Sequence, residues 1–188
     1  SDGSVIRTGL GVVGKGVRPN IGLLSGTGVQ TGIGIKVDHH MATSVQDIYA
    51  AGDAVEAHDC LRSKPWINAL WPNAVEQGRI AGINMTGGRE PYYGAIRLNS
   101  LEVFGLPCIS IGHVHEILTA SVNVHTHQHD GIYRKLFLSG DRVVGAVLTG
   151  DIRGAGVLTE LIRFSIPVSD RWIEDTMTRG PLYTRRLL

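Results

Sequence analysis

The sequence has few cysteines, no long apolar run and almost no net charge, and each shortage narrows the class of protein. Only 2 of its 188 residues are cysteines, and Cys60 and Cys108 stand too far apart for a C-x-x-C redox pair. So few cysteines, with no basic and apolar leader at the start, favour a reducing, cytoplasmic setting. No apolar run approaches the ~18 residues of a membrane helix. A formal net charge of +1 without a basic stripe argues against nucleic acid or an anionic membrane as a partner.

Glycine, by contrast, is abundant, with 25 of the 188 residues against the usual share of about 7 %. Residues 9–14, "GLGVVG", match the G-x-G-x-x-G fingerprint of dinucleotide-binding turns. In a true fingerprint a helix follows the glycine-rich turn, but glycine and proline recur too often in residues 14–28 for a helix to form there. We therefore interpret residues 10–16 as a buried strand whose glycines allow close approach of another backbone or a ligand. Because the chain opens inside strand-like sequence, we expect it to be part of a longer protein.

The first half of the chain is predicted to hold short strands followed by one clear helix. Strands are expected at residues 35–37 and 48–51, and a short helix at residues 54–64. Pro72 is typical of a first helical position, and Gly87-Gly88 is typical of a helix end. The side chains expected on the buried face of this helix are Val75, Gly78, Gly82 and Met85.

The composition changes near residue 91, beyond which strands dominate. Residues 101–112 are predicted to bend at Gly105-Leu106-Pro107, and residues 132–150 to form a hairpin around a type II′ turn at Gly140-Asp141. A short helix at residues 156–164, stopped by Pro167, is expected to bury Val157, Leu158, Leu161, Ile162 and Phe164. The chain is therefore predicted to have an α/β part, residues 1–90, and a small α+β domain, residues 91–188.

Six features in order resemble the flavin-dependent pyridine nucleotide-disulfide oxidoreductase family. They are Gly16, Pro19-Asn20, Val37-Asp38, Thr43-Ser44, and the "IYAA" and "GD" of residues 48–53. The similarity continues through "LWPNAVEQGRIAGINMTG" and, more weakly, through "YRKLFL" and "RVVGAVLTGD". It is nearest to the NADH-dependent branch of nitrite reductases, rubredoxin and ferredoxin reductases, and NADH oxidases. The resemblance implies that residues 1–90 are the C-terminal strands and helices of an FAD-binding domain without its Gly-rich pyrophosphate loop, and residues 91–188 a dimerisation-type domain.

The resemblance implies an FAD site at Gly52, Asp53 and Ala54. Without a Cβ, Gly52 lets a ligand approach the backbone, and the Asp53 carboxylate can accept a charge-assisted hydrogen bond from a ribityl hydroxyl. The alternative is that Asp53 only caps a helix that begins near Ala54.

Trp71, Pro72 and Asn73 form the second part of the expected cofactor site. In the family a helix here points its N-terminus at the flavin pyrimidine edge, where free N–H groups favour negative charge. Trp71 either lies beside the flavin ring or, like Trp66, is an ordinary core aromatic residue. No residue is assigned as a catalytic acid, base or nucleophile.

Five histidines, His113, His115, His125, His127 and His129, stand at strand spacing. On an extended strand His125 and His129 are ~13 Å apart, too far for one metal ion. We interpret them as a solvated strand face and expect no metal site. A small metal protein built on these histidines is the less favoured alternative.

The family implies an oxidoreductase that passes a hydride from NAD(P)H to FAD and electrons onward to an acceptor. The sequence identifies neither this acceptor nor the NADH or NADPH preference, because the expected nicotinamide domain is outside it. The chain alone is expected to be inactive and to form a homodimer through residues 91–188. The alternative is a non-catalytic dimerisation or assembly module that holds no cofactor.

Overall fold

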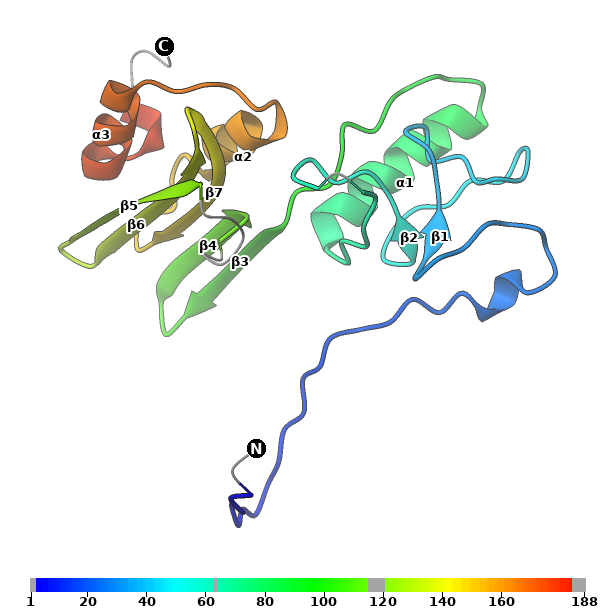
Figure 1. Ribbon diagram of the computed structural model, residues 1–188, viewed down its shortest axis with the longest axis horizontal. Coiled ribbons are helices and arrows are strands. Elements are labelled where there is room, and N and C mark those ends of the chain that lie inside the picture. Colours follow the sequence, from blue (N-terminus) through cyan, green and yellow to red (C-terminus); the bar gives the residue numbers. More distant parts are fainter. Residues whose placement is uncertain (1–2, 63, 115–120, 184–188) are drawn as a thin grey trace.

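Two regions, each with its own apolar core, lie side by side in the computed structural model (Figure 1). The structure describes residues 3–62, 64–114 and 121–183. The buried apolar residues of the first core extend as far as Ala95, and those of the second begin at Ile96. The division into domains at residue 91 stays a prediction. No helix among the described residues is long and apolar enough to cross a membrane.

The first region has little regular structure apart from one long helix. Its elements are the 3-10 helix η1 (Gly22–Leu24), the strands β1 (Ile35–Lys36) and β2 (Val55–Glu56), which pair in parallel, and the helix α1 (Trp71–Met85). Pro72 stands in the first turn of α1, and Gly87 follows its end with a left-handed φ of 91°. The predicted start and end of this helix are therefore confirmed.

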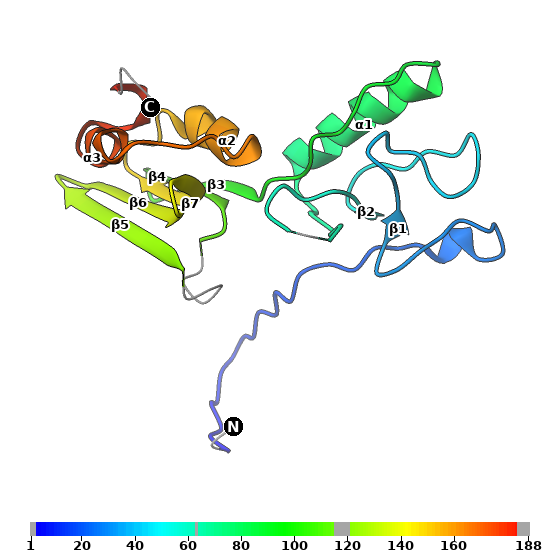
Figure 2. The same cartoon turned by 45° about the horizontal axis from the view of Figure 1, so that its top comes forward.

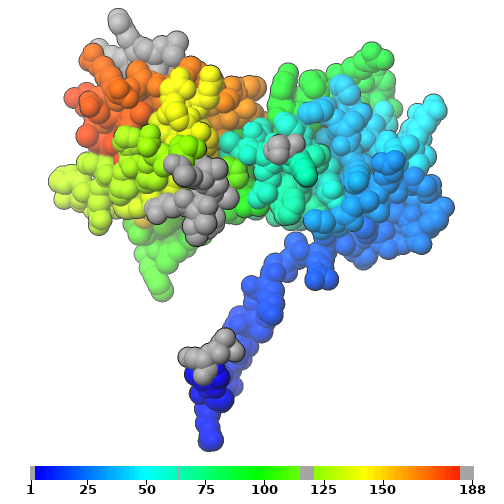
Figure 3. Space-filling model, viewed as in Figure 1, coloured from blue at the N-terminus to red at the C-terminus, as the bar shows by residue number. Residues whose placement is uncertain are grey.

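The predicted buried strand at residues 10–16 is wrong. This segment belongs to an extended arm that leaves the body of the protein (Figure 3), and Leu10, Val12 and Val13 are 79–90 % exposed. An extended segment becomes a strand only when a neighbouring strand accepts its backbone hydrogen bonds. No described segment lies beside this arm and supplies that edge.

The predicted helix at residues 54–64 is also wrong. The backbone is extended over residues 55–59 and turns at Cys60-Leu61, and Val55, Ala57 and Asp59 are accordingly buried at every second position, the period of a strand. The expected strand at residues 48–51 is reduced to one isolated bridge between Ala42 and Tyr49. The first region is thus held by short pairings and turns rather than by a wide sheet.

Helix α1 buries the face opposite to the predicted one. Val75 and Met85 are exposed, as are Gly78 and Gly82. The buried residues are Asn73, Gln77, Ile80, Ala81 and Asn84. Three of these five carry amides, and burial of an amide is favourable only when its polar atoms find partners. All three have partners in this structure, so the buried face of α1 combines satisfied amides with the apolar Ile80 and Ala81 of the first core.

The second region is an antiparallel five-stranded sheet with two helices, in agreement with the predicted α+β class. The strands are β3 (Leu98–Val103), β4 (Leu106–Gly112), β5 (Val122–His129), β6 (Ile132–Ser139) and β7 (Arg142–Thr149). Their order across the sheet is β3-β4-β7-β6-β5. The strands β3 and β5 therefore form the two edges.

Each tight turn of this sheet contains a glycine with a positive φ. Gly140 has a φ of 61° while Asp141 does not have a positive φ, as the predicted type II′ turn requires. The predicted bend near Gly105 is a full hairpin turn between β3 and β4. There both Phe104 and Gly105 have positive φ, and the Phe104 side chain is completely exposed.

Two helices, α2 (Ala155–Arg163) and α3 (Asp170–Arg179), cover the same face of the sheet (Figure 2). Helix α2 buries Leu158, Leu161 and Ile162 as predicted, but Phe164 lies past its last turn and is half exposed. Helix α3 was missed because most of its residues are polar. Its start is marked by Ser169, whose side chain accepts a hydrogen bond from the Trp172 backbone.

A few polar contacts join the two regions. The Arg163 guanidinium at the end of α2 binds the Glu76 carboxylate of α1 through two nitrogens, the shorter distance being 2.8 Å. The His113 Nε2 lies 3.2 Å from the Leu61 carbonyl oxygen, and the Asn73 amide donates to the Ile96 carbonyl. Helix α1 is thus tied to the second region through Asn73 and Glu76, which both stand in its N-terminal half.

Candidate functional site

The structure brings the Gly52-Asp53 pair against the first turn of α1. Gly52 has a left-handed φ of 93°, a conformation that side chains with a Cβ rarely adopt. A Cβ added at Gly52 would lie 3.9 Å from the Ala74 Cβ in the first turn of the helix. The two segments that the sequence predicted as parts of one site, residues 52–54 and 71–73, are therefore neighbours in space.

A buried amide holds these two segments together. The Gly52 N–H donates to the Gln77 Oε1 over 2.8 Å, and the Gln77 Nε2 donates to the Tyr92 hydroxyl over 3.3 Å. Gln77 and Tyr92 are 3 % and 1 % exposed. Burial raises the pKa of Tyr92 to about 12, so its hydroxyl stays neutral at ordinary pH. Gln77 thus fixes the position of the Gly52 peptide relative to the helix.

Asp53 extends from this turn into solvent. Its side chain is exposed and makes no hydrogen bond or ion pair with any residue that the structure describes. Because residues 54–62 contain no helix, the alternative in which Asp53 caps a helix is contradicted. The Ala54 carbonyl accepts a hydrogen bond from the Ile35 N–H and so ties the turn to β1. The Asp53 carboxylate remains available to an outside ligand.

The N-terminus of α1 is electrostatically unsatisfied. No side chain caps it and its first turn has no acidic residue. Pro72 has no N–H, and the Ala74 N–H bonds the Leu70 carbonyl. The N–H groups of Trp71 and Asn73 have no partner inside the helix, so they and the helix dipole favour an anionic ligand group.

The side chains at this terminus differ in their access to a ligand. Trp71 is 77 % exposed, which contradicts its reading as a core aromatic residue. The Asn73 side chain is buried, because its amide bonds the Ile96 carbonyl. Only the backbone of Asn73 can therefore reach a ligand at the helix end. The cofactor-binding roles of Gly52, Asp53, Ala54, Trp71, Pro72 and Asn73 stay predictions.

Two thiols and a pair of histidines are the remaining reactive side chains considered for the site. Cys60 and Cys108 are both free thiols, and Cys108 lies on β4 in the second region. Burial raises the pKa of the Cys60 thiol to about 11, so Cys60 is protonated and weakly nucleophilic at neutral pH. The rings of His39 and His58 lie 4.8 Å apart, and burial together with His39 lowers the pKa of His58.

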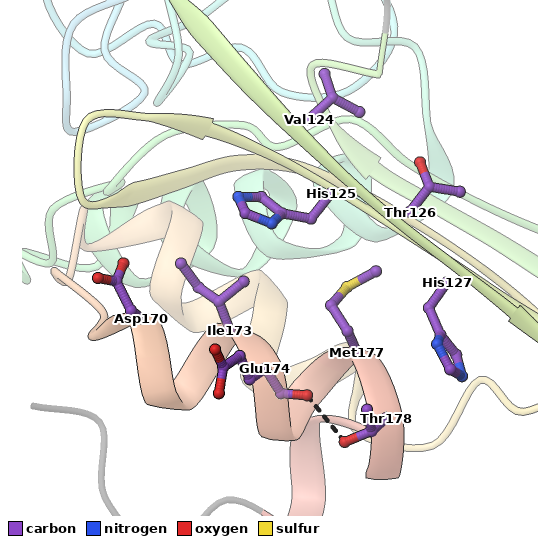
Figure 4. A pocket seen from close by; sticks show the side chains of 9 residues that line it. All are labelled: Val124, His125, Thr126, His127, Asp170, Ile173, Glu174, Met177 and Thr178. Atoms are coloured by element: carbon purple, nitrogen blue, oxygen red, sulfur yellow. Dashed lines mark hydrogen bonds between the residues drawn. The ribbon is translucent and has the colours of Figure 1, made fainter.

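The histidines of the second region are not all on an open strand face. His125 and His127, on β5, line a cavity of about 630 Å³ against α3 (Figure 4), whereas His129 lies outside it. His113 lies at the junction of the two regions, and His115 is outside the described residues, as is the chain from residue 184 on. No group of three metal-ligating side chains occurs among the residues that the structure describes.

Comparison with known proteins explains why these two regions occur together. Residues 1–78 match the family model "Pyridine nucleotide-disulphide oxidoreductase", and residues 98–166 match "Rubredoxin NAD+ reductase C-terminal domain". The two matches follow each other in the order in which the two cores occur. The chain belongs to the pyridine nucleotide-disulphide oxidoreductase family.

Individual oxidoreductases of this family are similar over most of the chain. Subunit epsilon of the NADH-dependent phenylglyoxylate dehydrogenase of Aromatoleum evansii is 32 % identical over 95 % of this chain and 44 % of its own length. The NAD(P)H nitrite reductase of Bacillus subtilis is 31 % identical over 90 % of this chain and 20 % of its own length. The structure of an NAD-dependent persulfide reductase from A. fulgidus superposes with a TM-score of 0.74, at 30 % identity over 92 % of this chain and 35 % of the other. The chain therefore spans less than half the length of these relatives, and the family and branch predicted from the sequence are confirmed.

Sequence reasoning found the two segments of the candidate site but missed the residues that join them. Gln77 was passed over because a glutamine within a helix is usually exposed to solvent. A signal was present, since Asn73, Gln77 and Asn84 recur at spacings of four and seven residues, which places three amides on one helix face. Tyr92 left no comparable signal, because its partner stands 15 residues away.

Proposed function

We propose that this chain forms one wall of the flavin site of an FAD-dependent NAD(P)H oxidoreductase. The observation that carries the proposal is the left-handed Gly52 beside the uncapped N-terminus of α1. Its residues fit the group, because an exposed carboxylate suits a polyhydroxyl chain and an unneutralised helix end suits the electron-rich edge of a flavin. When bound, FAD would accept a hydride from NAD(P)H and release electrons to an acceptor of unassigned identity.

The residues of this chain act by binding and by electrostatics. Asp53 accepts a hydrogen bond from a ribityl hydroxyl, and Gly52 allows the chain of the cofactor to pass close to the backbone. The N–H groups of Trp71 and Asn73, with the dipole of α1, stabilise negative charge on the pyrimidine edge. The exposed Trp71 indole, at the same helix end, would be available to cover the ring and exclude water from it. Gln77 keeps these parts at a constant separation through its bond to Gly52.

Retention of FAD by the complete flavoenzyme tests this proposal. We expect Asp53→Ala to weaken FAD binding by roughly 1.5–3 kcal/mol, or about 10- to 150-fold, because a charge-assisted hydrogen bond is lost. The measurement is the flavin fluorescence that stays with the protein after dialysis of samples at decreasing protein concentration. The matched control is Glu102→Ala, which removes an exposed carboxylate of β3. Equal flavin content in both variants, with equal thermal stability, would remove Asp53 from the site.

A homodimer through residues 91–188 is proposed in addition. It is supported by an exposed apolar surface on the β3–β4 hairpin, where Leu101, Val103, Phe104 and Leu106 are 42–105 % exposed, next to an open strand edge. The same surface favours the second candidate function, an assembly module without cofactor. FAD titrations of the complete protein separate the two. Both candidates give weak binding or none to the purified chain, because the rest of the flavin domain is missing, whereas binding to the complete protein that Asp53→Ala weakens decides for the oxidoreductase.

A further inference from the structure

A groove runs along the free edge of the sheet in the second region, between β5 and α3 (Figure 4). Its volume is about 630 Å³. It is far from Gly52 in the fold and takes no part in the proposed flavin site. Val124, His125, Thr126 and His127 line it from the strand, and Asp170, Ile173, Glu174, Met177 and Thr178 from the helix.

The backbone of β5 leaves hydrogen-bonding groups unpaired along the edge that borders this groove. Strand β5 pairs with β6 on one side only, and within the described residues no strand lies on its other side. A two-residue turn, in which Asp130 and Gly131 both have positive φ, joins the pair of His129 and Ile132. In such a hairpin this pair and every second pair exchange hydrogen bonds. Val124, Thr126 and Gln128 therefore direct their N–H and C=O groups outward.

The opposite wall carries two carboxylates without partners. Asp170 and Glu174 are exposed, and neither forms an ion pair with a residue that the structure describes. One helical turn separates them by a rise of about 6 Å. Alternate side chains of an extended strand repeat at about 6.6–6.8 Å, which nearly matches this spacing. Ile173 and Met177, each 7 % exposed, form an apolar floor between the carboxylates and the strand.

We propose that this groove binds an extended, basic segment of a partner protein, which adds a sixth strand to the sheet at β5. The backbone of that segment pairs with Val124, Thr126 and Gln128, as in other complexes formed by strand addition. Two Lys or Arg side chains, two positions apart, reach Asp170 and Glu174, while the intervening backbone covers the apolar floor. The carboxylates select a basic segment, and the open edge selects an extended one.

Fluorescence anisotropy of the full chain with a labelled hexapeptide, Thr-Lys-Val-Lys-Val-Thr, tests the proposal. We expect saturable binding that weakens at least tenfold when glutamate replaces both lysines, or when the lysines are made adjacent. Methylation of the backbone nitrogens that face β5 should have a similar effect. Absence of saturable binding, or equal binding of all these peptides, would overturn the proposal.

Variants of the chain locate the site. The double variant Asp170→Asn/Glu174→Gln should weaken peptide binding at least tenfold, whereas the matched pair Glu102→Gln/Asp141→Asn, on exposed hairpins elsewhere, should leave it unchanged. Thr126→Pro removes an outward N–H of an edge strand without removing a bond to β6, and should also abolish binding. Near-UV circular dichroism checks the fold of each variant. Unchanged peptide binding by Asp170→Asn/Glu174→Gln would overturn the proposal. A dimer of the chain that Thr126→Pro dissociates would also overturn it, because a second copy of the chain would then occupy the β5 edge.

Discussion

The region before Ala95 and the region after it are stabilised in different ways. The second region closes on itself, with two helices packed on one face of a five-stranded sheet and a continuous core of aliphatic residues around Trp172. The first has two-residue strands, a small core around Met41 and Ile80, and an arm whose apolar side chains are exposed. Where the core is small, buried amides such as Gln77 and Asn84 set the arrangement. A region organised by polar contacts around a small core depends on further protein or on a ligand for its stability, which accords with its proposed place in a flavin site.

Separation of the two regions should have the largest effect. Residues 96–188 alone are expected to fold with a cooperative thermal transition, because their sheet and helices enclose a core of their own. Residues 1–95 alone, which keep Tyr92 and Ala95 of the first core, should lack one, because they bury too little apolar surface to offset the loss of chain entropy. Differential scanning calorimetry and light scattering measure both properties. A cooperative transition of residues 1–95 would contradict the comparison, and a strictly monomeric 96–188 at every concentration would contradict the proposed dimer.

Matched truncations within the two cores should differ by a smaller amount. Ile111 is 0 % exposed in the second core and Ile80 is 1 % exposed in the first. Ile111→Ala should lower the free energy of unfolding by about 2–5 kcal/mol. Ile80→Ala should lower it by about 2 kcal/mol, because the residues of the smaller first core can move into the cavity that the substitution leaves. Urea denaturation of the full chain gives both values. An equal or larger loss for Ile80→Ala would show that the first core is packed as tightly as the second.

The ion pair between Arg163 and Glu76 tests whether the two regions are coupled. The side chains are 16 % and 27 % exposed, so solvent screens the pair only in part. A double-mutant cycle with Arg163→Met and Glu76→Gln should give a coupling energy of about 1 kcal/mol. The control cycle uses Arg79→Met and Glu90→Gln, an exposed pair within the first region, and should give less. A coupling energy of zero in the first cycle would show that this ion pair does not couple the two regions.

The smallest expected effect is a dependence of the first region on pH. Burial, and then the nearby His39, lower the pKa of His58 from its ordinary value of 6.5, while Asp59 opposes the shift. Below pH 6.5 the unfolded chain binds a proton at this position more readily than the folded one. Stability should therefore be complete above that pH and decline as the pH falls toward the lowered folded value. Unfolding curves at pH 5 to 8 should show a shallower decline for His58→Gln, and an unchanged slope would exclude His58 as the cause.

Features set by local stereochemistry were predicted correctly from the sequence. Pro72 marks the start of α1 because its fixed φ suits a first helical turn, and Gly140 marks the hairpin because its turn needs a positive φ. The face of α2 followed from its apolar spacing. The family, and the two segments of the candidate site, followed from the order of short motifs around Gly52 and Pro72, and the structure places those segments side by side.

Only the tertiary structure decided the features that depend on distant partners. Residues 10–16 have the composition of a strand, but a strand exists only beside another backbone. The orientation of α1 involves contacts with distant residues, because Gln77 on its buried face bonds Gly52 and Tyr92, and Ile80 beside it enters the first core. The His125 and His127 side chains line a groove because α3, whose polar sequence concealed it, packs against β5. In each case the deciding contact joins residues far apart in the chain, and short-range patterns carry no information about it.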